Sequence, residues 1–511
     1  MAKYLRASMI LGVAAMLAGC GGGGGSSSSS SEPAPSSSAS TSSSATTPSS
    51  SSSVAPREVN ISFWTAFGQT PLEAAQKAAK DFSKIIKEQT GDIVNIDITY
   101  GGGYDEIRTK IEQGFAVGNI PTMSIAYPDH VANYLGQSKN YVYNIQPFMD
   151  DPDIGFCTQP YLGDSDLYDA DDFVEAYLDE GRHYKYEGTY SMPLMKSSEI
   201  LFYNYDAMLL AIAAMPDNFL PDAPRSSPED FLAAIDWDEF MQLCQFIKDH
   251  KNQILDTLEV PCQYDSDGNF FVSEMFQNNI PYGSIGPDGV GRIDFESGDA
   301  RANTEKMVNK LKGYVDAGLL TTKGVTGQYG SYDFAACKSV FVIGSSGGAG
   351  YNEPAGDIFK PAVARVPAFN KANPLYVTQG PTMTFLRNPT LSDEVNDLRA
   401  SYAWQFAKYI TNPAVNVYLC VWGSEGYVPV RYSAYEDSKY QSFLSQGEFT
   451  AQSAQVLINE IDGKFISSDV FVGSAELRDK VGGVLTQVFS GDKDTTTAIT
   501  DMILYVKTFL K

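Results

Sequence analysis

Hydrophobic and polar positions repeat with two different periods in the first part of the folded chain. Residues 59–64 predict a buried strand, and residues 94–100 alternate apolar and polar side chains as a second strand. Apolar residues recur at helical spacing between them, and this helix is predicted to begin at Thr70, the first residue of a Thr-Pro-Leu-Glu capping box. A helix from Tyr104 and a third strand over 122–127 follow. This order of strands and helices predicts right-handed crossovers and a parallel sheet.

The loops that follow these three strands carry the first candidate site residues. Ligands of open α/β sheets bind at the carboxyl ends of the strands. Trp64 ends the first strand, Tyr104 follows the glycines of the second loop, and Asp129 follows the third strand. Aromatic faces, free backbone amides and a carboxylate suit a small polar ligand. We therefore expect Trp64, Tyr104 and Asp129 near a binding site.

Later segments predict a strand over 199–205 and two strands, at 339–343 and 376–380, that run into glycine-containing turns. The turn 344–348 reads Gly-Ser-Ser-Gly-Gly, which matches the Gly-x-Ser-x-Gly nucleophile motif of hydrolases. In those enzymes the catalytic histidine follows the serine, whereas all three histidines of this chain precede it. A turn whose amides bind a ligand oxygen is the favoured interpretation.

Two further patterns concern carboxylates. Asp265-Ser-Asp267-Gly resembles the start of a calcium loop, but its glycine comes two places too early, so an acidic surface turn is predicted. Carboxylates are abundant throughout the chain, and a glycosidase pair therefore stays open as an alternative. The C-terminal part predicts helices over 395–409, 475–489 and 495–510.

The N-terminus has the pattern of a secretory signal. Lys3 and Arg6 precede the apolar run 9–18, which is too short to span a bilayer. The run ends in Leu-Ala-Gly-Cys, which looks like a bacterial lipobox and predicts cleavage before Cys20 and attachment of lipid, such as palmitate, to its sulfur. An ordinary signal peptide with an accidental cysteine is the alternative.

The segment 21–56 supports the lipobox interpretation. It consists of five glycines followed by serine, threonine, alanine and proline with almost no apolar content, so it cannot bury a core. A flexible segment of this length spans about 30–36 Å on average. We therefore expect the folded part to be held outside the cell membrane on a lipid-anchored tether.

Composition narrows the function classes. The chain has 511 residues and a formal net charge of −25, and clustered Lys and Arg are what phosphate backbones require, so no nucleic-acid partner is expected. Hydrophobic residues at 43% and aromatic residues at 12% are sufficient for folded cores. With only three histidines, zinc enzymes and histidine acid–base chemistry are disfavoured, and no metal or cofactor is predicted.

The chain resembles a known family once these features are taken in order. It is similar to bacterial extracellular solute-binding proteins of the carbohydrate type, over residues 57–490. The resemblance implies two α/β lobes with mostly parallel sheets, a ligand cleft between them, and delivery of the ligand to the permease subunits of an ABC importer. The features are the lipobox, the serine-rich tether, the Phe-Trp end of the first strand, Tyr104 before a helix, Gly-Asn-Ile-Pro at 118–121, Met-Pro at 192–193 with Phe-Tyr-Asn at 202–204, Gln-Gly at 379–380, and Gly-Tyr-Val-Pro-Val-Arg at 426–431 after Ala-Trp-Gln-Phe at 403–406.

Within that family the chain is most similar to glycerol-phosphate-binding members. Serine hydroxyls and glycine amides would donate to a phosphoryl or sugar oxygen, and Arg478 would supply a charged fork. Those members place a glutamate in the third loop, where this chain has the shorter Asp129, so phosphorylated polyol and neutral sugar both stay open. Trp64 and Trp422 are candidates for the cleft or for the core. The pocket implied by the resemblance comprises Tyr104, Ser197, Ser198, Ser345, Gly380, Tyr427 and Arg478.

These features together predict a monomeric, extracytoplasmic substrate-binding lipoprotein without catalysis. A lipid-anchored polysaccharide-processing enzyme and a tethered sensor or adhesin are the alternatives. No CxxC pair occurs among the cysteines after Cys20, so one or two disulfides or buried free thiols are both compatible with the sequence. The predicted division is 1–19 signal peptide, 20–56 tether, 57–195 and 337–378 first lobe, and 196–336 and 379–511 second lobe.

Overall fold

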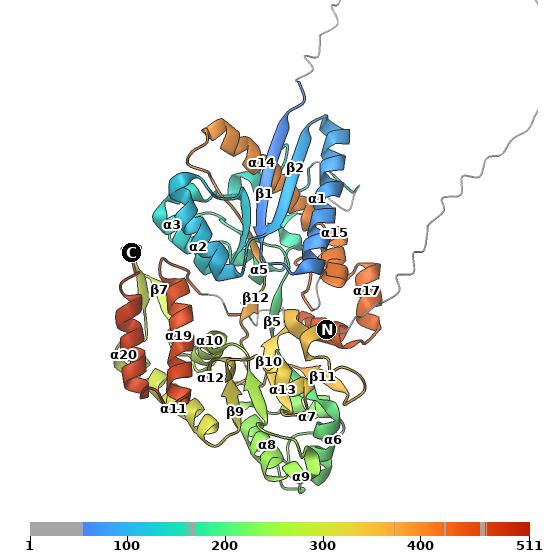
Figure 1. Ribbon diagram of the computed structural model, residues 1–511, viewed down its shortest axis with the longest axis vertical. Helices are drawn as coiled ribbons and strands as arrows, with labels where there is room; N and C mark the ends of the chain where they lie inside the picture. The colour runs from blue at the N-terminus through green and yellow to red at the C-terminus, as the bar shows by residue number, and fades with distance from the viewer. Residues whose placement is uncertain are drawn as a thin grey trace, which may run out of the picture. The chain divides into compact units, whose positions relative to one another are not determined.

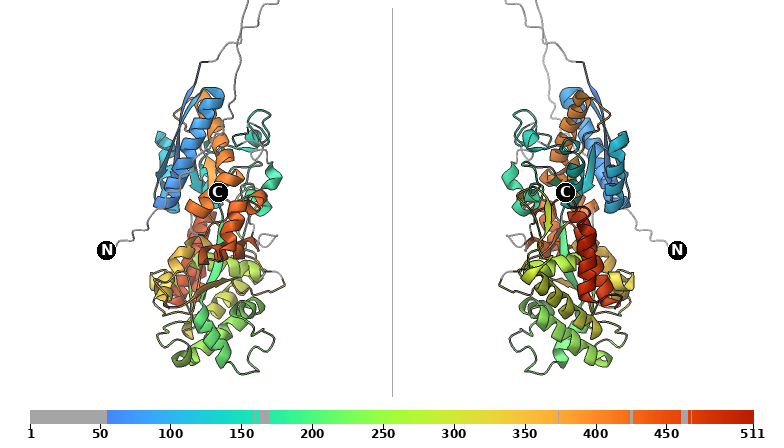
Figure 2. Two further views of the ribbon diagram at one scale, coloured as in Figure 1. Left: turned by 90° about the vertical axis from the view of Figure 1, so that its right-hand side faces the viewer. Right: turned by 90° about the vertical axis from the view of Figure 1, so that its left-hand side faces the viewer.

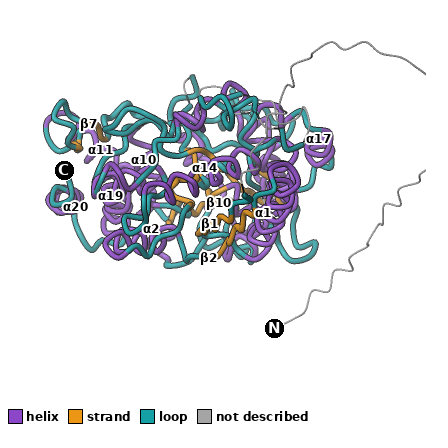
Figure 3. Tube along the Cα trace, turned by 90° about the horizontal axis from the view of Figure 1, so that it is seen from above, coloured by secondary structure: helices purple, strands orange, loops and turns teal. Residues whose placement is uncertain are grey.

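Two β-sheets covered by helices organise the chain from Pro56 to Lys511 (Figure 1). Seen from above, helices surround the strands of these sheets (Figure 3). The computed structural model describes residues 55–158, 160–162, 169–372, 374–423, 426–459, 465–466 and 468–511. The predicted signal peptide, Cys20 and most of the tether lie outside these residues. Within the described residues, no helix combines the length and the apolar character that crossing a bilayer requires.

The first sheet has the strand order β2-β1-β3-β13-β4. Strands β2 and β3 pair in parallel with β1, as the sequence predicts, while β13 runs antiparallel to β3 and β4. Its elements are β1 (Glu58–Thr65), α1 (Gln69–Thr90), β2 (Ile93–Tyr100), α2 (Tyr104–Gly114), η1 (Phe115–Val117), β3 (Met123–Ala126), α3 (Pro128–Gln137), η2 (Lys139–Tyr141), α4 (Gln146–Met149), η3 (Ala170–Asp172), α5 (Glu175–Asp179), β4 (Met192–Pro193), β13 (Thr382–Phe385), α14 (Asp393–Ile410), α15 (Pro413–Tyr418), η5 (Leu419–Gly423) and α16 (Tyr432–Tyr435).

Helix α1 buries the expected apolar face but begins earlier than predicted. The backbone N–H of Leu72 donates to the carbonyl of Gly68 at 3.0 Å, so Gly68 is the N-cap and Thr70 already lies in the first turn. Glu73 accepts a hydrogen bond from the side chain of Gln69 instead of closing a capping box with Thr70. The helix ends, as predicted, at Gly91, whose φ of 81° is the left-handed conformation that favours glycine.

The second sheet has the order β11-β5-β10-β6-β9, and β12 also pairs with β5. Strands β10, β6 and β9 are parallel, whereas β5 runs antiparallel to β10, β11 and β12. The elements that follow β4, apart from those of the first sheet, are β5 (Ser197–Asn204), α6 (Tyr205–Ala214), α7 (Pro228–Ala234), α8 (Trp237–Asp249), α9 (Lys251–Ile254), β6 (Cys262–Tyr264), α10 (Asp267–Gln277), β7 (Gly283–Ile285), β8 (Gly291–Ile293), α11 (Gly298–Asp316), β9 (Leu320–Thr322), α12 (Lys323–Thr326), α13 (Ser331–Ala335), β10 (Phe341–Ser345), η4 (Ser346–Asn352), β11 (Pro361–Ala364), β12 (Thr378–Gln379), α17 (Ser438–Ser445), α18 (Phe449–Ile458), α19 (Ser474–Phe489) and α20 (Thr495–Val506).

Different helices cover the two sheets. Helices α1 and α14 pack on the first sheet, while α19 and α20 lie beside α10 and α11 of the second (Figure 2). We call 56–195 with 381–437 the first lobe and 196–380 with 438–511 the second lobe.

The strand pairing corrects the predicted division of the chain. It assigned 337–378 to the first lobe, but β10 and β11 pair with β5 in the second sheet. It assigned 379–511 to the second lobe, but β13 joins the first sheet. The chain crosses between the lobes near 194–196, 380–381 and 437–438, and not near 337–345. A strand buried on both faces carries no pattern that identifies its partner sheet, and this explains the error.

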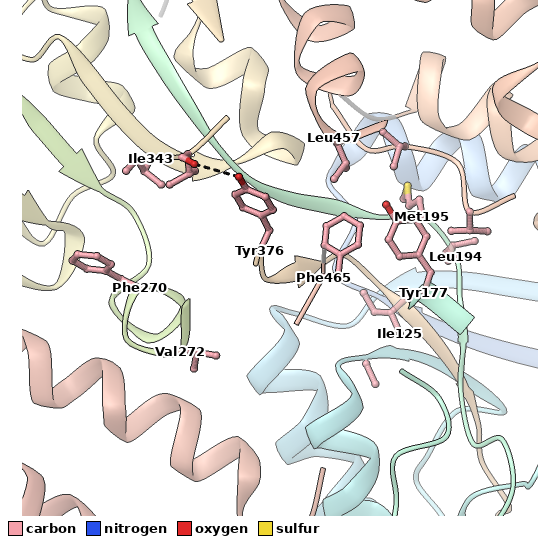
Figure 4. Close-up of a cluster of buried hydrophobic side chains, with 14 of the residues drawn as sticks. Ile125, Tyr177, Leu194, Met195, Phe270, Val272, Ile343, Tyr376, Leu457 and Phe465 are labelled. Carbon is pink, nitrogen blue, oxygen red and sulfur yellow. Dashed lines mark hydrogen bonds between the residues drawn. The ribbon is translucent and has the colours of Figure 1, made fainter. Parts of the chain in front are cut away.

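Apolar side chains pack continuously from the first sheet to the second (Figure 4). Ile125 of β3 and Ile343 of β10 belong to the same buried cluster, and the rings of Tyr177 and Phe465 lie 5.6 Å apart within it. Cys244 belongs to this core as well, and burial raises the pKa of its thiol well above the usual value.

One ion pair lies where the chain first crosses between the lobes. The ammonium group of Lys196, whose side chain is 1% exposed, pairs with the carboxylate of Glu180. The hydroxyl of Thr378, on β12, donates to the other oxygen of the same carboxylate. Glu180 therefore links the segments of the first and second crossings.

Candidate functional site

A cavity of about 1280 Å³ lies between the two lobes. Strand β5 begins and strands β10 and β12 end at its floor, and α12, α13, η4 and α19 form much of its wall. Its lining comprises Tyr104, Asp105, Tyr127 and Tyr427 from the first lobe, and Ser197, Glu199, residues 265–269, Lys323, Gly324, Gly327, Tyr329, Ser331, Tyr332, Ala335, Ser345, Gly347, Gly348, Tyr351, Asn352, residues 378–380, Arg478, Asp479, Gly482, Gly483 and Thr486 from the second.

Two stacked tyrosines form the wall that belongs to the first lobe. The rings of Tyr104 and Tyr127 lie 4.3 Å apart with an interplanar angle of 17°. Tyr104 begins α2 directly after a glycine turn in which Gly102 has a φ of 114°. Burial raises the pKa of both phenols, so each keeps its proton. The wall therefore offers aromatic faces and neutral hydroxyl groups.

Serine hydroxyls and backbone amides form the floor of the cavity. Ser345 Oγ donates to Ser197 Oγ at 3.3 Å and accepts from the backbone N–H of Gly347 at 3.3 Å. Ser198 is fully buried, and its hydroxyl donates to the carbonyl of Val377 at 3.1 Å. Ser197 and Ser345 therefore face the cavity, whereas Ser198 holds two strands together.

Gly380 lies at the second crossing between the lobes. Its φ is 102°, and a Cβ there would come within 2.6 Å of the carbonyl oxygen of Met195. Only glycine fits this conformation and this close approach without strain. Gly380 therefore allows the two crossing segments to run side by side beneath the cavity.

Carboxyl groups outnumber cationic groups in the lining. Asp105, Glu199, Asp265, Asp267 and Asp479 face the cavity, against Lys323 and Arg478. Burial raises the pKa of Glu199 to about 8 and that of Asp265 to about 6. Glu199 is therefore mostly protonated at neutral pH, and the remaining carboxylates leave the cavity with a negative charge.

The acidic turn that the sequence predicts at the surface lies at this cavity instead. Asp267 is 9% exposed and accepts hydrogen bonds from Thr322 Oγ1 at 2.6 Å and from the backbone N–H of Gly324 at 2.9 Å. Asp265 accepts from the backbone N–H of Gly330 at 2.7 Å. These carboxylates fix the loops that follow β6 and β9.

Arg478 connects the two lobes at the edge of the cavity. Its Nη2 lies 3.1 Å from Oδ2 of Asp129, and its guanidinium lies over the ring of Tyr127 at 4.7 Å from the centroid. Burial is the largest single influence and lowers the pKa of Arg478, but Asp129, Tyr127, Asp479 and Tyr282 together more than offset it and keep the pKa raised. Asp129 itself is 6% exposed and reaches the cavity only through this ion pair.

The residues predicted from the sequence divide into two groups in the structure. Trp64 is half-buried and packs against the core, and Trp422, in η5, is 70% exposed; neither lines the cavity, nor does Ser198. Asp129 contacts Arg478 behind the lining. Those that line the cavity are Tyr104, Ser197, Ser345, Gly380, Tyr427 and Arg478.

Sequence reasoning missed three tyrosines of the second lobe. Tyr329, Tyr332 and Tyr351 line the cavity and are 51%, 67% and 77% exposed. Tyr351 follows the glycine-rich turn 344–348 by only a few residues, so this turn was the available signal for it. Nothing in the local pattern distinguishes Tyr329 and Tyr332 from ordinary loop residues.

Comparison with known proteins gives both a family and a fold. The family model described as bacterial extracellular solute-binding protein matches residues 77–443. No curated protein sequence matches the chain at a significant level.

Several solved structures share the fold. UgpB from Mycobacterium tuberculosis, in complex with glycerophosphocholine, has a TM-score of 0.63 at 16% identity, covering 88% of this chain and 98% of its own. The GacH receptor of Streptomyces glaucescens, solved with acarbose, has a TM-score of 0.60 at 17% identity, covering 89% of this chain and 98% of its own. A cyclic alpha-maltosyl-1,6-maltose binding protein from Arthrobacter globiformis has a TM-score of 0.61 at 15% identity, covering 88% of this chain and 99% of its own. The predicted two-lobe α/β fold is confirmed.

Proposed function

Because the chain belongs to the bacterial extracellular solute-binding proteins, which act outside the cytoplasm and bind solutes without catalysis, we propose that it captures a carbohydrate-type solute for an ABC importer. The solute binds in the cavity between the lobes, and the lobes close on it by hinge motion. Permease subunits in the membrane then receive it from the closed form.

The composition of the cavity is the observation that carries this proposal. Stacked Tyr104 and Tyr127 and the exposed tyrosines of the second lobe offer flat apolar faces for the carbon faces of sugar rings. Serine hydroxyls, backbone amides and carboxylates between them bind hydroxyl groups. The structural neighbours named above were solved with, or are named for, sugar-like ligands in two cases and glycerophosphocholine in one.

The charge of the cavity favours a neutral sugar over a phosphorylated polyol. Carboxylates accept hydrogen bonds from hydroxyl groups, whereas they repel a phosphate. Arg478 already shares its charge with Asp129, and Lys323 lies over the ring of Tyr329 at 3.6 Å from its centroid. A phosphodiester is the second candidate, because Arg478 is the cation that a phosphate would need at this edge of the cavity.

A thermal-shift panel tests the proposal. A solute that binds only the folded state raises the melting temperature. The panel holds maltose, maltotriose, other neutral oligosaccharides, glycerol 3-phosphate and glycerophosphocholine, each analysed afterwards for chemical change. We expect a neutral oligosaccharide to raise the melting temperature and to be recovered intact. Hydrolysis of an oligosaccharide would instead support a polysaccharide-processing enzyme.

Lipid anchoring is the second part of the proposal. We expect Cys20→Ser to release the protein from the membrane fraction without changing its melting temperature, because the sequence that follows Cys20 has almost no apolar side chains and predicts a tether. Fractionation after a salt wash measures this, with Cys157→Ser as the matched cysteine control. Retention of the Cys20→Ser protein in the washed membrane pellet would contradict the anchoring.

A further inference from the structure

Charged side chains join the two lobes along one edge of the cavity. Arg478 of α19 pairs with Asp129 of α3 at 3.1 Å, and Glu476 of α19 pairs with Arg108 of α2 at 2.9 Å. The side-chain amide of Asn133, on α3, donates to Glu476 at 3.3 Å. Because α19 belongs to the second lobe and α2 and α3 to the first, these contacts exist only while the lobes are closed at this edge.

A histidine lies directly behind these contacts. His130 is 1% exposed, and neither of its ring nitrogens has a hydrogen-bond partner among the described residues. Its Nε2 lies 3.8 Å from Oδ1 of Asp129 and 3.6 Å from Oδ1 of Asp105, and the ring of Tyr127 packs against it edge-on. Burying an imidazole whose two nitrogens lack hydrogen bonds is unfavourable. Opening of the lobes can relieve this cost by giving the ring nitrogens hydrogen-bond partners.

Asp129 has one oxygen for each of two partners. Its Oδ2 pairs with Arg478, whereas its Oδ1 is buried, lacks a hydrogen bond among the described residues and faces His130. A protonated imidazole would need to move by only about 1 Å to reach hydrogen-bond distance from Oδ1. Arg478 and a protonated His130 can therefore each supply a cation that neutralises the same carboxylate.

We propose, on the basis of the solute capture proposed above, that Asp129 pairs with Arg478 when the lobes close and with protonated His130 when they open, so that closure releases one proton from the imidazolium of His130 to solvent. The latch, defined as His130, Asp129 and Arg478, makes solute affinity depend on pH.

The direction of the pH dependence follows from which charged groups stay beside His130 when the lobes open. Asp129 and Asp105 stay beside His130 in the first lobe, whereas opening removes Arg478 with α19 and admits water. In the closed structure burial lowers the pKa of His130 to about 4, with Arg478 and Arg108 acting in the same direction against the two aspartates. Water and the loss of Arg478 both raise the pKa in the open form, to about 6.5 or above. The open form therefore binds a proton that the closed form does not, and acidification from about pH 6.5 downward weakens binding.

Other titratable groups surround the latch, and one of them opposes it. Burial and the neighbouring Asp105 raise the pKa of Asp479 to about 6 in the closed structure, so opening lets Asp479 lose a proton. Variants of His130 must therefore be compared with the wild type at each pH. The groups around His130 are Asp105, Arg108 and Glu112 from α2, Tyr127, Asp129 and Tyr134 at or in α3, Glu476, Arg478 and Asp479 from α19, and Tyr282 before β7.

An engineered disulfide tests the latch without any solute, so the result does not depend on which solute the protein binds. A Cβ at Gly136 of α3 would lie 3.3 Å from Cβ of Val472, which precedes α19, so a small separation of the two elements brings the pair into the disulfide range of about 3.5–4.5 Å. Gly136→Cys with Val472→Cys should therefore lock the lobes closed when oxidised and free them when reduced. The pKa of His130 is then read by NMR of the imidazole groups, which are only three in the chain. His130→Gln assigns the signal.

We expect a pKa of His130 below 5 in the oxidised protein and about 6.5 or above in the reduced, ligand-free protein. Asp129→Asn in the reduced protein should lower the second value. Equal pKa values in the oxidised and reduced forms overturn the proposal, as does no effect of Asp129→Asn.

A second experiment measures the affinity for maltotriose at different pH values. Between pH 7.5 and pH 5, the affinity of the wild type should fall about 20–30-fold relative to His130→Gln. The matched control is His250→Gln, because His250 caps the end of α8 in the second lobe and is not part of the latch, and this variant should follow the wild type. A constant ratio between wild type and His130→Gln also overturns the latch. If maltotriose fails to bind all three proteins, that result counts against the proposed solute class, and the disulfide arm still decides the latch.

Discussion

Glu180→Gln should lower the free energy of unfolding by about 3–5 kcal/mol, the range for breaking one side of a buried ion pair. The substitution leaves the ammonium group of Lys196 buried at 1% exposure without a counter-charge. It also weakens the acceptor of the Thr378 hydroxyl, which holds the other crossing segment. Denaturant unfolding followed by circular dichroism measures the loss.

Two variants make this result specific to the ion pair. Glu175→Gln, on the exposed face of α5, removes the same charge and should change stability by less than about 0.5 kcal/mol. Adding Lys196→Met to Glu180→Gln removes the stranded charge and should restore most of the stability. An equal loss in the single and double variants would mean that packing, and not the ion pair, determines the stability of the crossing.

Arg478→Ala should cost a phosphodiester about 2–5 kcal/mol of binding free energy, as expected when one partner of a buried charged pair is truncated. Maltotriose should lose only about 1 kcal/mol, because it loses a contact between the lobes but no direct charge pair. Arg478→Lys should restore part of the phosphodiester loss, since lysine lacks the bidentate fork.

Titration calorimetry with glycerophosphocholine and maltotriose at one pH and ionic strength gives these values. Screening limits the field of the acidic chain to about 8 Å at physiological salt, so the local guanidinium dominates the comparison. Equal losses for both solutes would show that Arg478 acts only as a structural link to Asp129, and the phosphodiester candidate would then be rejected.

The first lobe is the part of the fold that the sequence predicts best. Alternating strands and an amphipathic helix made the pairing of β1, β2 and β3 predictable, and with it the places of Tyr104 and Tyr127 at the ends of strands. Local periodicity is sufficient for β1, α1 and β2, which each have a more buried and a more exposed face, whereas β3 is buried throughout and follows from the order of strands and helices.

Long-range pairings were not predictable in the same way. Strand β10 is buried on both faces, so its pattern fits either sheet, and the sequence placed it in the wrong lobe. The contact between Asp129 and Arg478 joins residues far apart in the chain, and only the tertiary fold brings them together. Trp422 lies on the surface. The sequence could not predict this, because an aromatic residue beside a helix can equally lie in a core, in a cleft or on the surface.

The central claim is that the solute binds in the cavity between the lobes, and a substitution that fills this cavity tests it most directly. Gly483 of α19 lines the cavity, and Gly313 of α11 lies on the surface elsewhere; a Cβ added at either glycine would have no neighbouring atom within 4 Å, so both positions accept a larger side chain. Calorimetry is performed with the panel solute that gives the largest thermal shift, on the wild type, Gly483→Phe and Gly313→Phe. We predict that Gly483→Phe loses at least about 100-fold in affinity, or about 2.7 kcal/mol, while Gly313→Phe binds as the wild type does. Unchanged affinity in a folded Gly483→Phe protein would contradict the account, because the solute would then bind outside the cavity.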